Sequence, residues 1–156
     1  MRLKVLMGAV LFSLVVSLSP ITSHAQSSRN NSTVNEFTYE EAQLLMKVAQ
    51  AEAGNQGEDG MWLVLSVITN RVKSESFPDS VTEVCYQKNQ FETVTTGAID
   101  KVEISAECHR ALARIETGEV AEAIVAFENS KNKSLERYFS TAFEYRDHVF
   151  YTLSNN

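Results

Sequence analysis

A glutamate lies on the apolar side of a predicted helix. At about 100° per helical residue, Glu52 projects near the middle of a sector formed by the side chains of Leu44, Leu45, Val48 and Ala49. Glycines at positions 54, 57 and 60 interrupt the helical pattern directly afterwards. A carboxyl that is desolvated by apolar neighbours stays protonated to higher pH and can act as a general acid. We interpret Glu52 as a candidate acid at the lip of a cleft, the alternative being an exposed glutamate at a helix end.

The histidines and cysteines do not indicate a metal or cofactor. Beyond the N-terminal leader the histidines are His109 and His148, and the chain contains no HExxH or CxxC spacing. We therefore expect neither a bound metal nor a cofactor. Cys85 and Cys108 are the only cysteines, and they could form a disulfide after export or remain separate buried thiols.

The N-terminal residues have the pattern of a secretory signal peptide. Arg2 and Lys4 precede an apolar run over residues 5–18, and Ser23-His24-Ala25 forms a small-x-small cleavage site. The run of about 14 residues is shorter than the roughly 20 that span a bilayer. We predict a signal peptide at 1–25, a secreted or extracytoplasmic protein, and no stable membrane insertion after cleavage. An uncleaved anchor would reach the same compartment.

The remaining chain is acidic and long enough for one domain. Removal of residues 1–25 leaves 131 of 156 residues, with 12 basic and 20 acidic side chains and a net charge of −8. Without a concentrated basic patch, nucleic acid is not an expected partner. The polar residues 26–37 predict a disordered linker, followed by a domain at 38–153 that we expect to be monomeric.

The order of the predicted elements indicates an α+β fold. Thr38 and Glu41 form a capping box that begins a first helix ending near Ala53. A second helix, from about Asp59 to Lys73, is apolar nearly all round and is therefore expected at the centre of the core. The later segments are a short helix from Ser80 to Cys85, a loop with a short strand or hairpin at 93–97, a helix at 105–117, and strands at 123–127, 138–143 and 147–151. Helices followed by strands are typical of α+β domains.

Several short motifs occur in a characteristic order between residues 41 and 151. They are Glu52, Gly60, Val64, Val67, Asn70-Arg71-Val72, Phe77-Pro78-Asp79-Ser80-Val81, Val84, Tyr86-Gln87, Gln90-Phe91 and His148-Val149-Phe150-Tyr151. Together they resemble the SleB-type cell wall hydrolase family, the catalytic domain of spore cortex-lytic enzymes. The resemblance implies a mostly helical, lysozyme-like domain with a small antiparallel β element in its C-terminal half.

The resemblance also implies a protein that is associated with the cell wall and acts on peptidoglycan glycan strands. The expected reaction is cleavage between N-acetylmuramic acid and N-acetylglucosamine by a lytic transglycosylase that uses Glu52 as its single acid and base. Residues that would line or buttress the glycan cleft are Gln90, Phe91, His148 and Tyr151. Asn129 lies where the family often has a polar residue, and Tyr138 is an aromatic residue that could stack on a sugar ring.

Three other activities remain open at this stage. Lysozyme-type hydrolysis would need a second carboxylate across the cleft from Glu52, for which Glu92, Glu144 and Asp147 are candidates. An N-acetylmuramoyl-L-alanine amidase would generally need a zinc site. A non-catalytic wall-binding module could keep the same fold.

Overall fold

The computed structural model describes residues 35–154. The predicted signal peptide and most of the predicted linker lie outside this range. Residues 35–37 were expected to be linker, but they pack against the folded unit: the Asn35 side chain donates a hydrogen bond to the Ile115 carbonyl at 2.6 Å, and Phe37 packs against the core. These three residues therefore belong to the folded unit.

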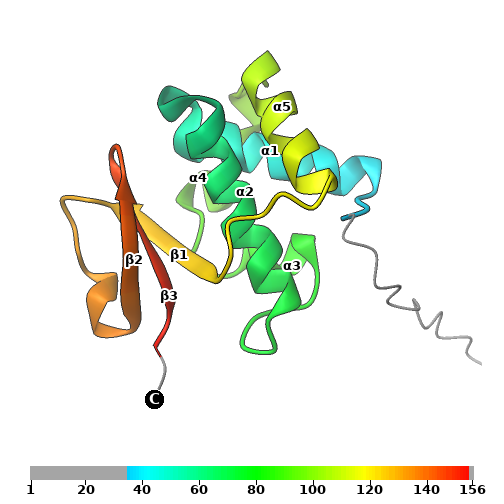
Figure 1. Cartoon of the computed structure of the whole chain (residues 1–156). Coiled ribbons are helices and arrows are strands. Elements are labelled where there is room, and N and C mark those ends of the chain that lie inside the picture. The colour runs from blue at the N-terminus through cyan, green and yellow to red at the C-terminus, as the bar shows by residue number, and fades with distance from the viewer. Residues whose placement is uncertain (1–34, 155–156) are drawn as a thin grey trace, which may run out of the picture. The chain divides into compact units, whose positions relative to one another are not determined.

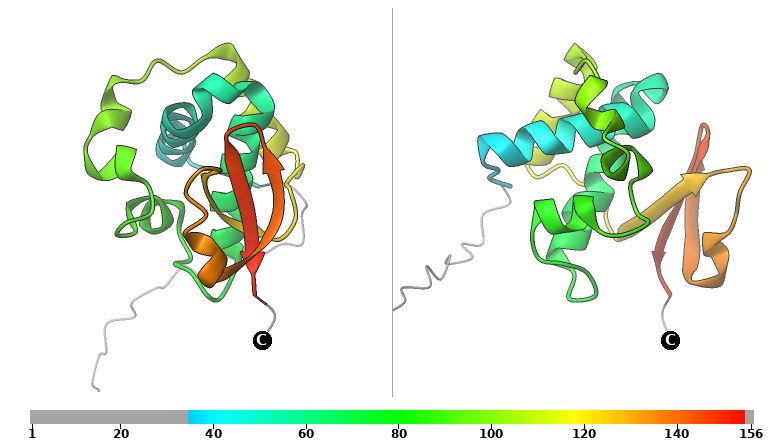
Figure 2. Two further views of the ribbon diagram at one scale, coloured as in Figure 1. Left: turned by 90° about the vertical axis from the view of Figure 1, so that its left-hand side faces the viewer. Right: turned by 180° about the vertical axis from the view of Figure 1, so that it is seen from behind.

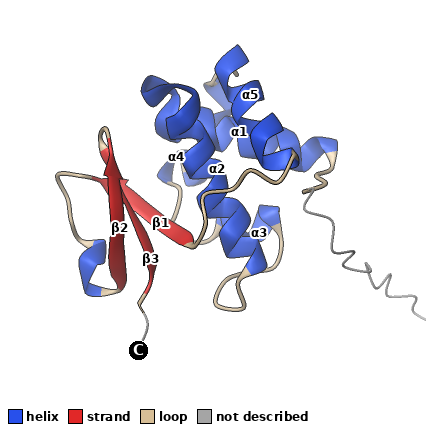
Figure 3. Ribbon diagram, in the orientation of Figure 1, coloured by secondary structure: helices blue, strands red, loops and turns tan. Residues whose placement is uncertain are grey.

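Helices occupy the first part of the described chain and strands the last part (Figures 1 and 3). The elements are α1 (Tyr39–Ala53), η1 (Gly54–Gln56), α2 (Gly57–Lys73), α3 (Val81–Tyr86), α4 (Glu92–Thr95), η2 (Ala98–Lys101), α5 (Ala106–Glu116), β1 (Ile124–Asn129), η3 (Leu135–Arg137), β2 (Phe139–Tyr145) and β3 (His148–Leu153). The predicted mostly helical α+β class, with its small β element in the C-terminal half, is confirmed.

Helix α1 begins with the predicted capping box. The hydroxyl oxygen of Thr38 accepts a hydrogen bond from the Glu41 amide at 3.2 Å, and the Glu41 carboxylate accepts one from the Thr38 amide at 2.9 Å. These two bonds satisfy amides that the first turn of a helix cannot satisfy itself. The helix starts one residue after Thr38 and carries Glu52 in its last turn.

Helix α2 is the centre of the fold, as its apolar composition predicted. It packs against α1, α3, α5 and β1 (Figure 1). It begins at Gly57, two residues before the predicted start, where the backbone has a φ of +73° that favours glycine. Gly60 is also required by space, because a Cβ at this position would lie 2.5 Å from the Cβ of Gln56.

The prediction of a short strand or hairpin at 93–97 is wrong. Residues 92–95 form the one-turn helix α4, and Gly97 follows in the left-handed conformation. Threonine and valine favour strands in a pleated sheet, but here the hydroxyls of Thr95 and Thr96 donate hydrogen bonds to the Glu92 carbonyl at 3.0 and 2.9 Å. Local hydrogen bonds of this kind override the strand preference.

The three predicted strands form an antiparallel sheet in the order β1-β3-β2. Strand β1 makes the main contact of the sheet with α2, so the sheet lies beside the helical part of the unit (Figure 2). Its inner side buries Phe150 with Ile124 and with Leu63 and Val67 of α2. Most of β2 is exposed.

Both cysteines are free and buried, so the disulfide that the sequence left open is not formed. Burial raises the pKa of the Cys85 thiol to about 12 and that of Cys108 to about 11. The Cys108 thiol donates a hydrogen bond to the Met46 carbonyl at 3.4 Å. Within residues 35–154, no helix combines the length and the apolar character needed to cross a membrane.

Candidate active site

Glu52 is held between the end of α1 and the short helix α4. Its side chain is partly buried, and its Oε1 accepts a hydrogen bond from the Thr93 hydroxyl at 2.6 Å. This contact joins segments 41 residues apart in sequence. It fixes the orientation of the carboxyl, while partial burial keeps part of it accessible.

The surroundings of Glu52 favour its protonated form. Burial raises the pKa of the Glu52 carboxyl above its ordinary value, and the neighbouring charge of Glu92 raises it further. The hydrogen bond from Thr93 acts in the opposite direction but does not outweigh burial. A carboxylic acid that keeps its proton to higher pH is suited to protonating a leaving group.

The turn after Glu52 is anchored to the sheet. Gln56 is 2% exposed, and its Nε2 lies 3.0 Å from Nδ1 of His148. Gly60 lies beside the Tyr145 ring. The missing side chain at Gly60 leaves room for this ring of β2, and the contact between Gln56 and His148 places the turn after α1 next to the start of β3.

His148 and Asn129 lie opposite each other where β1 and β3 pair. His148 is largely buried, with its ring 5.0 Å from that of Phe127. Burial lowers the pKa of His148, although the charge of Asp147 acts against this change. Asn129 is exposed, and its side-chain oxygen accepts a hydrogen bond from the Lys131 amide at 3.1 Å. His148 is therefore a supporting residue near the turn after Glu52, whereas Asn129 is free to meet solvent.

Gln90 and Phe91 point in different directions. Gln90 is exposed, but Phe91 is only 2% exposed and packs against Phe127, with ring centroids 6.2 Å apart. Gln90 is the member of this pair that is open to solvent, whereas Phe91 lines the inner side of a hollow. Phe91 supports the wall from inside.

The two predicted tyrosines also differ. Tyr151 is fully buried, and its hydroxyl donates a hydrogen bond to the Glu128 carboxylate at 2.8 Å. Tyr138 is exposed and directly precedes β2, whereas His148 pairs with Tyr145 at the other end of that strand. At about 3.3 Å per residue, the ends of this strand are separated by roughly 20 Å. The structure therefore does not bring Tyr138 and His148 to one point.

Two adjoining hollows lie along the segment that leads into α4. One has a volume of about 460 Å³ and is lined by Asn89, Gln90, Glu92 and Thr95. The other has a volume of about 290 Å³, shares Asn89 and Gln90, and extends to Arg71. Glu52 is not a lining residue of either hollow, but Thr93, its hydrogen-bond partner, belongs to the same short helix as Glu92 and Thr95. Thr93 could not be predicted as a site residue, because its contact with Glu52 joins segments 41 residues apart and no local sequence pattern indicates such a contact.

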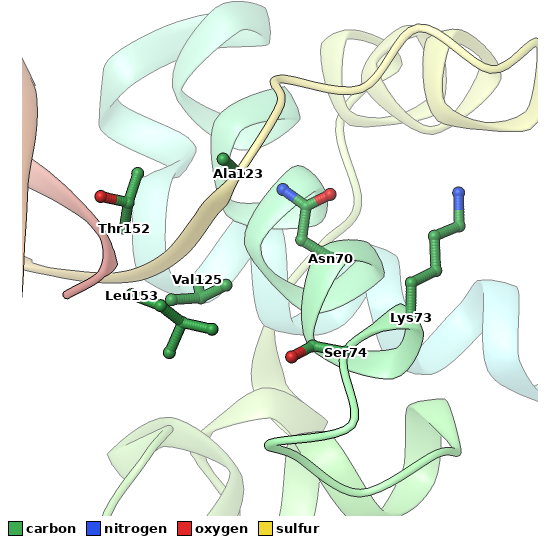
Figure 4. A pocket seen from close by; sticks show the side chains of 7 residues that line it. All are labelled: Asn70, Lys73, Ser74, Ala123, Val125, Thr152 and Leu153. Atoms are coloured by element: carbon green, nitrogen blue, oxygen red, sulfur yellow. The ribbon is translucent and has the colours of Figure 1, made fainter. Parts of the chain in front are cut away.

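A third hollow lies away from these residues, at the C-terminal end of α2. Its volume is about 400 Å³, and its lining includes Asn70, Lys73, Val125 and Thr152 (Figure 4). None of the predicted site residues lines it. Asn70 has a structural role here, since its amide donates to the carbonyls of Ala121 and Ile124, both at 2.8 Å. Within residues 35–154, no group of three histidine, cysteine or acidic side chains is placed to hold a metal ion.

The sequence matches the family model of the cell wall hydrolases over residues 55–151. The chain belongs to the cell wall hydrolase family. This hydrolase is therefore an enzyme that acts on peptidoglycan. The matched segment begins three residues after Glu52, so the match includes the sheet and the hollows but not the candidate acid itself.

Solved structures show the same fold as this hydrolase. The catalytic domain of the germination-specific lytic transglycosylase SleB from Bacillus anthracis superposes with a TM-score of 0.66 at 21% identity, over 76% of this chain and 98% of that one. The catalytic domain of the SleB protein from Bacillus cereus gives a TM-score of 0.64 at 21% identity, over 80% of this chain and 99% of that one. No curated protein matches the sequence significantly. The predicted resemblance to SleB-type cell wall hydrolases is confirmed.

Proposed function

We propose that this hydrolase cleaves peptidoglycan between N-acetylmuramic acid and N-acetylglucosamine as a lytic transglycosylase, with Glu52 as its acid and base. The observation that carries the proposal is the partly buried Glu52 carboxyl, whose pKa is raised by burial and whose orientation is fixed by the 2.6 Å hydrogen bond from Thr93. The name of the Bacillus anthracis neighbour, a lytic transglycosylase, agrees with this reaction.

In this reaction one carboxyl performs two proton transfers. Protonated Glu52 donates its proton to the glycosidic oxygen while the bond from that oxygen to C1 of the muramoyl residue breaks. The 6-hydroxyl of the same residue then forms a bond to C1, and the Glu52 carboxylate accepts the hydroxyl proton. The products are a 1,6-anhydromuramoyl end and a free 4-hydroxyl on the leaving sugar. Because the substrate supplies its own nucleophile, a second catalytic carboxylate is unnecessary.

The other predicted site residues have two kinds of role in this proposal. Exposed Gln90, Asn129 and Tyr138 contact the glycan, whereas His148 holds the turn after Glu52 through Gln56. Phe91 and Tyr151 act from the core, by supporting the walls from which these side chains project. Residues 1–25 would direct this enzyme out of the cytoplasm to its substrate, with 26–34 leading into a catalytic domain that begins at residue 35.

Hydrolysis by water is the second candidate reaction, and Glu92 is the observation that favours it. The Glu92 carboxylate is close enough to Glu52 to influence its pKa, and it lines the neighbouring hollow. A second carboxylate at a suitable distance can direct water or attack the sugar. The other two candidates are less suited to this role, since Glu144 pairs with Lys133 at 3.6 Å and Asp147 acts on His148.

The decisive experiment compares Glu52→Gln with the wild type on purified peptidoglycan, with mass spectrometry of the soluble products. General acid–base catalysis contributes roughly 10²–10⁴-fold, so turnover should fall by at least about a hundredfold. Glu40→Gln, at an exposed position of the same helix, is the matched control and should keep wild-type turnover. The folded state of Glu52→Gln should persist at neutral pH, because the substitution removes a partly buried carboxyl that is costly to ionise.

The products separate the candidate reactions. Anhydromuramoyl ends support transglycosylation, reducing muramoyl ends support hydrolysis, and free stem peptides would identify an amidase. Binding without any product would identify a wall-binding module. Wild-type turnover in Glu52→Gln would reject Glu52 as the acid.

A further inference from the structure

The side chain of Arg71 is buried without a counter-ion. Arg71, in the last turn of α2, is 4% exposed. Its Nε donates a hydrogen bond to the Val125 carbonyl, but its Nη1 has no hydrogen-bond partner among residues 35–154. A buried guanidinium that is neither paired nor fully hydrogen-bonded is strongly unfavourable. Such a group in a native structure indicates that something else completes it.

Arg71 is one of the residues that line the cavity of about 290 Å³ described above. Aromatic rings hold it in place, with its Cζ 5.0 Å from the ring centroid of Phe77 and 5.8 Å from that of Phe91. The exposed residues Asn89 and Gln90 lie at the same cavity. A planar, fixed guanidinium is the protein group best suited to bind a carboxylate through two parallel hydrogen bonds.

Both charges at this cavity are present at neutral pH. Burial lowers the pKa of Arg71 only to about 10, so its guanidinium stays protonated. Glu128 also lines the cavity, and although burial raises the pKa of its carboxyl, three hydrogen bonds outweigh burial and lower it. These bonds come from the Ser134 hydroxyl at 2.7 Å, the Leu135 amide at 2.8 Å and the Tyr151 hydroxyl at 2.8 Å.

Glu128 does not neutralise Arg71. Its two oxygens are already occupied by these three donors, and within the described part of the chain it forms no ion pair with Arg71. The cavity therefore offers one free positive group, with a fixed negative charge at its lining. The Glu128 carboxylate repels any anion in this cavity, and a doubly charged phosphate about twice as strongly as a singly charged carboxylate. Among anions, a ligand with a single negative charge is therefore the one that fits this arrangement best.

We propose that Arg71 binds a carboxylate of the peptidoglycan substrate in this cavity. The inference rests on the proposed function insofar as the substrate is a peptidoglycan strand. The cavity shares Asn89 and Gln90 with the second hollow, whose other lining residues, Glu92 and Thr95, flank Thr93 in α4. A strand bound along this segment would thus have one group at Arg71 and another near the Glu52 carboxyl.

Peptidoglycan carries two sources of such a carboxylate. The lactyl group of muramic acid has a free carboxylate where the stem peptide is missing, and the stem peptide carries carboxylates of its own. Both present the same chemistry to Arg71. Binding measurements with substrates of defined composition separate the two sources.

The test measures binding by calorimetry in the Glu52→Gln protein, which avoids turnover of the probe. The probes are a muramoyl tetrasaccharide without peptides, the same tetrasaccharide with stem peptides, the methyl ester of each, and a chitin tetrasaccharide. We expect at least one acid probe to bind about ten- to a hundredfold more tightly than its own ester. If only the peptide-free acid binds more tightly than its ester, the carboxylate at Arg71 is that of the lactyl group. If only the peptide-bearing acid binds more tightly than its ester, the carboxylate belongs to the stem peptide.

Variants of Arg71 test whether this preference arises at the cavity. Arg71→Gln should bind acid and ester equally, and Arg71→Lys should keep part of the preference because it retains the charge. Arg110→Gln is the control, since Arg110 is an exposed arginine paired with Glu58 on the surface. If Arg71→Gln does not fold, Arg71→Lys takes its place: a weaker acid preference in this variant supports the proposal, and an unchanged preference counts against it. The proposal would be overturned if every acid bound as tightly as its ester, or if folded Arg71→Gln kept the full preference for the acid. Either result would count against Arg71 even if product analysis upholds transglycosylation.

Discussion

The hydrogen bond from Thr93 to Glu52 gives a direct test of how this site sets the acidity of its carboxyl. The bond is 2.6 Å long and lowers the pKa of Glu52, while burial raises it. Thr93→Val removes the hydroxyl and keeps a branched side chain of similar shape. The pKa of Glu52 should therefore rise in the variant, and the protonated acid should persist to higher pH.

The size of the change follows from the kind of bond that is lost. Hydrogen bonds to charged groups contribute about 1.5–3 kcal/mol. Because Glu52 is only partly buried, the lower end of this range applies. About 1.4 kcal/mol corresponds to a tenfold change in an ionisation constant. The alkaline limb of the pH–rate profile, which reports loss of the catalytic proton, should then move to higher pH by about one pH unit.

The assay follows the release of soluble fragments from a peptidoglycan suspension across a series of buffers of constant ionic strength. Thr96→Val is the matched control, because the Thr96 hydroxyl donates to the Glu92 carbonyl and not to Glu52. The control should keep the wild-type profile. An alkaline limb that stays in place in Thr93→Val, or moves to lower pH, would refute this account of the acid.

Two further substitutions test the site and its supporting turn. Glu92→Gln removes a charge that raises the pKa of Glu52, so the alkaline limb should move to lower pH, most clearly at low salt. Turnover should survive this change if Glu52 acts alone, whereas loss of turnover would favour hydrolysis with two carboxylates. Gly57→Ala places a side chain at a φ of +73° and a ψ of −169°, a region essentially confined to glycine, and should lower the free energy of unfolding by about 1–3 kcal/mol, measured by thermal unfolding. Gly54→Ala, at a φ of −59° and facing the flexible end of Gln50, should cost less; equal losses would argue against backbone strain at Gly57.

Structural features that depend on residues close in sequence could be predicted from the sequence alone. The capping box of Thr38 and Glu41, the apolar circumference of α2 and the three strands all follow from spacing over a few residues. The short helix α4 was missed because its threonines and valine favour strands, while the hydrogen bonds that decide its conformation are made by the threonine hydroxyls.

Structural features that depend on contacts between segments far apart in sequence could not be predicted. Sequence placed Phe91 and Tyr151 at the site together with Gln90, but only the packing of the sheet shows that both aromatic residues are buried. The unpaired guanidinium of Arg71 and the bond from Thr93 to Glu52 arise from segments that meet only in the folded chain. Sequence therefore indicated the identity of the candidate acid but not the groups that tune it.

The contact of Gln56 with His148 ties the turn after α1 to the start of β3. It joins residues 92 positions apart through two buried side chains, so the end of α1 and the start of β3 are clamped to each other. A movement of the sheet away from the helices would have to break this contact. It would leave two buried polar side chains without a hydrogen-bond partner. The segment at Asn89 and Gln90 is exposed and leads directly into α4. A movement of this segment would therefore also move Thr93, the hydrogen-bond partner of Glu52.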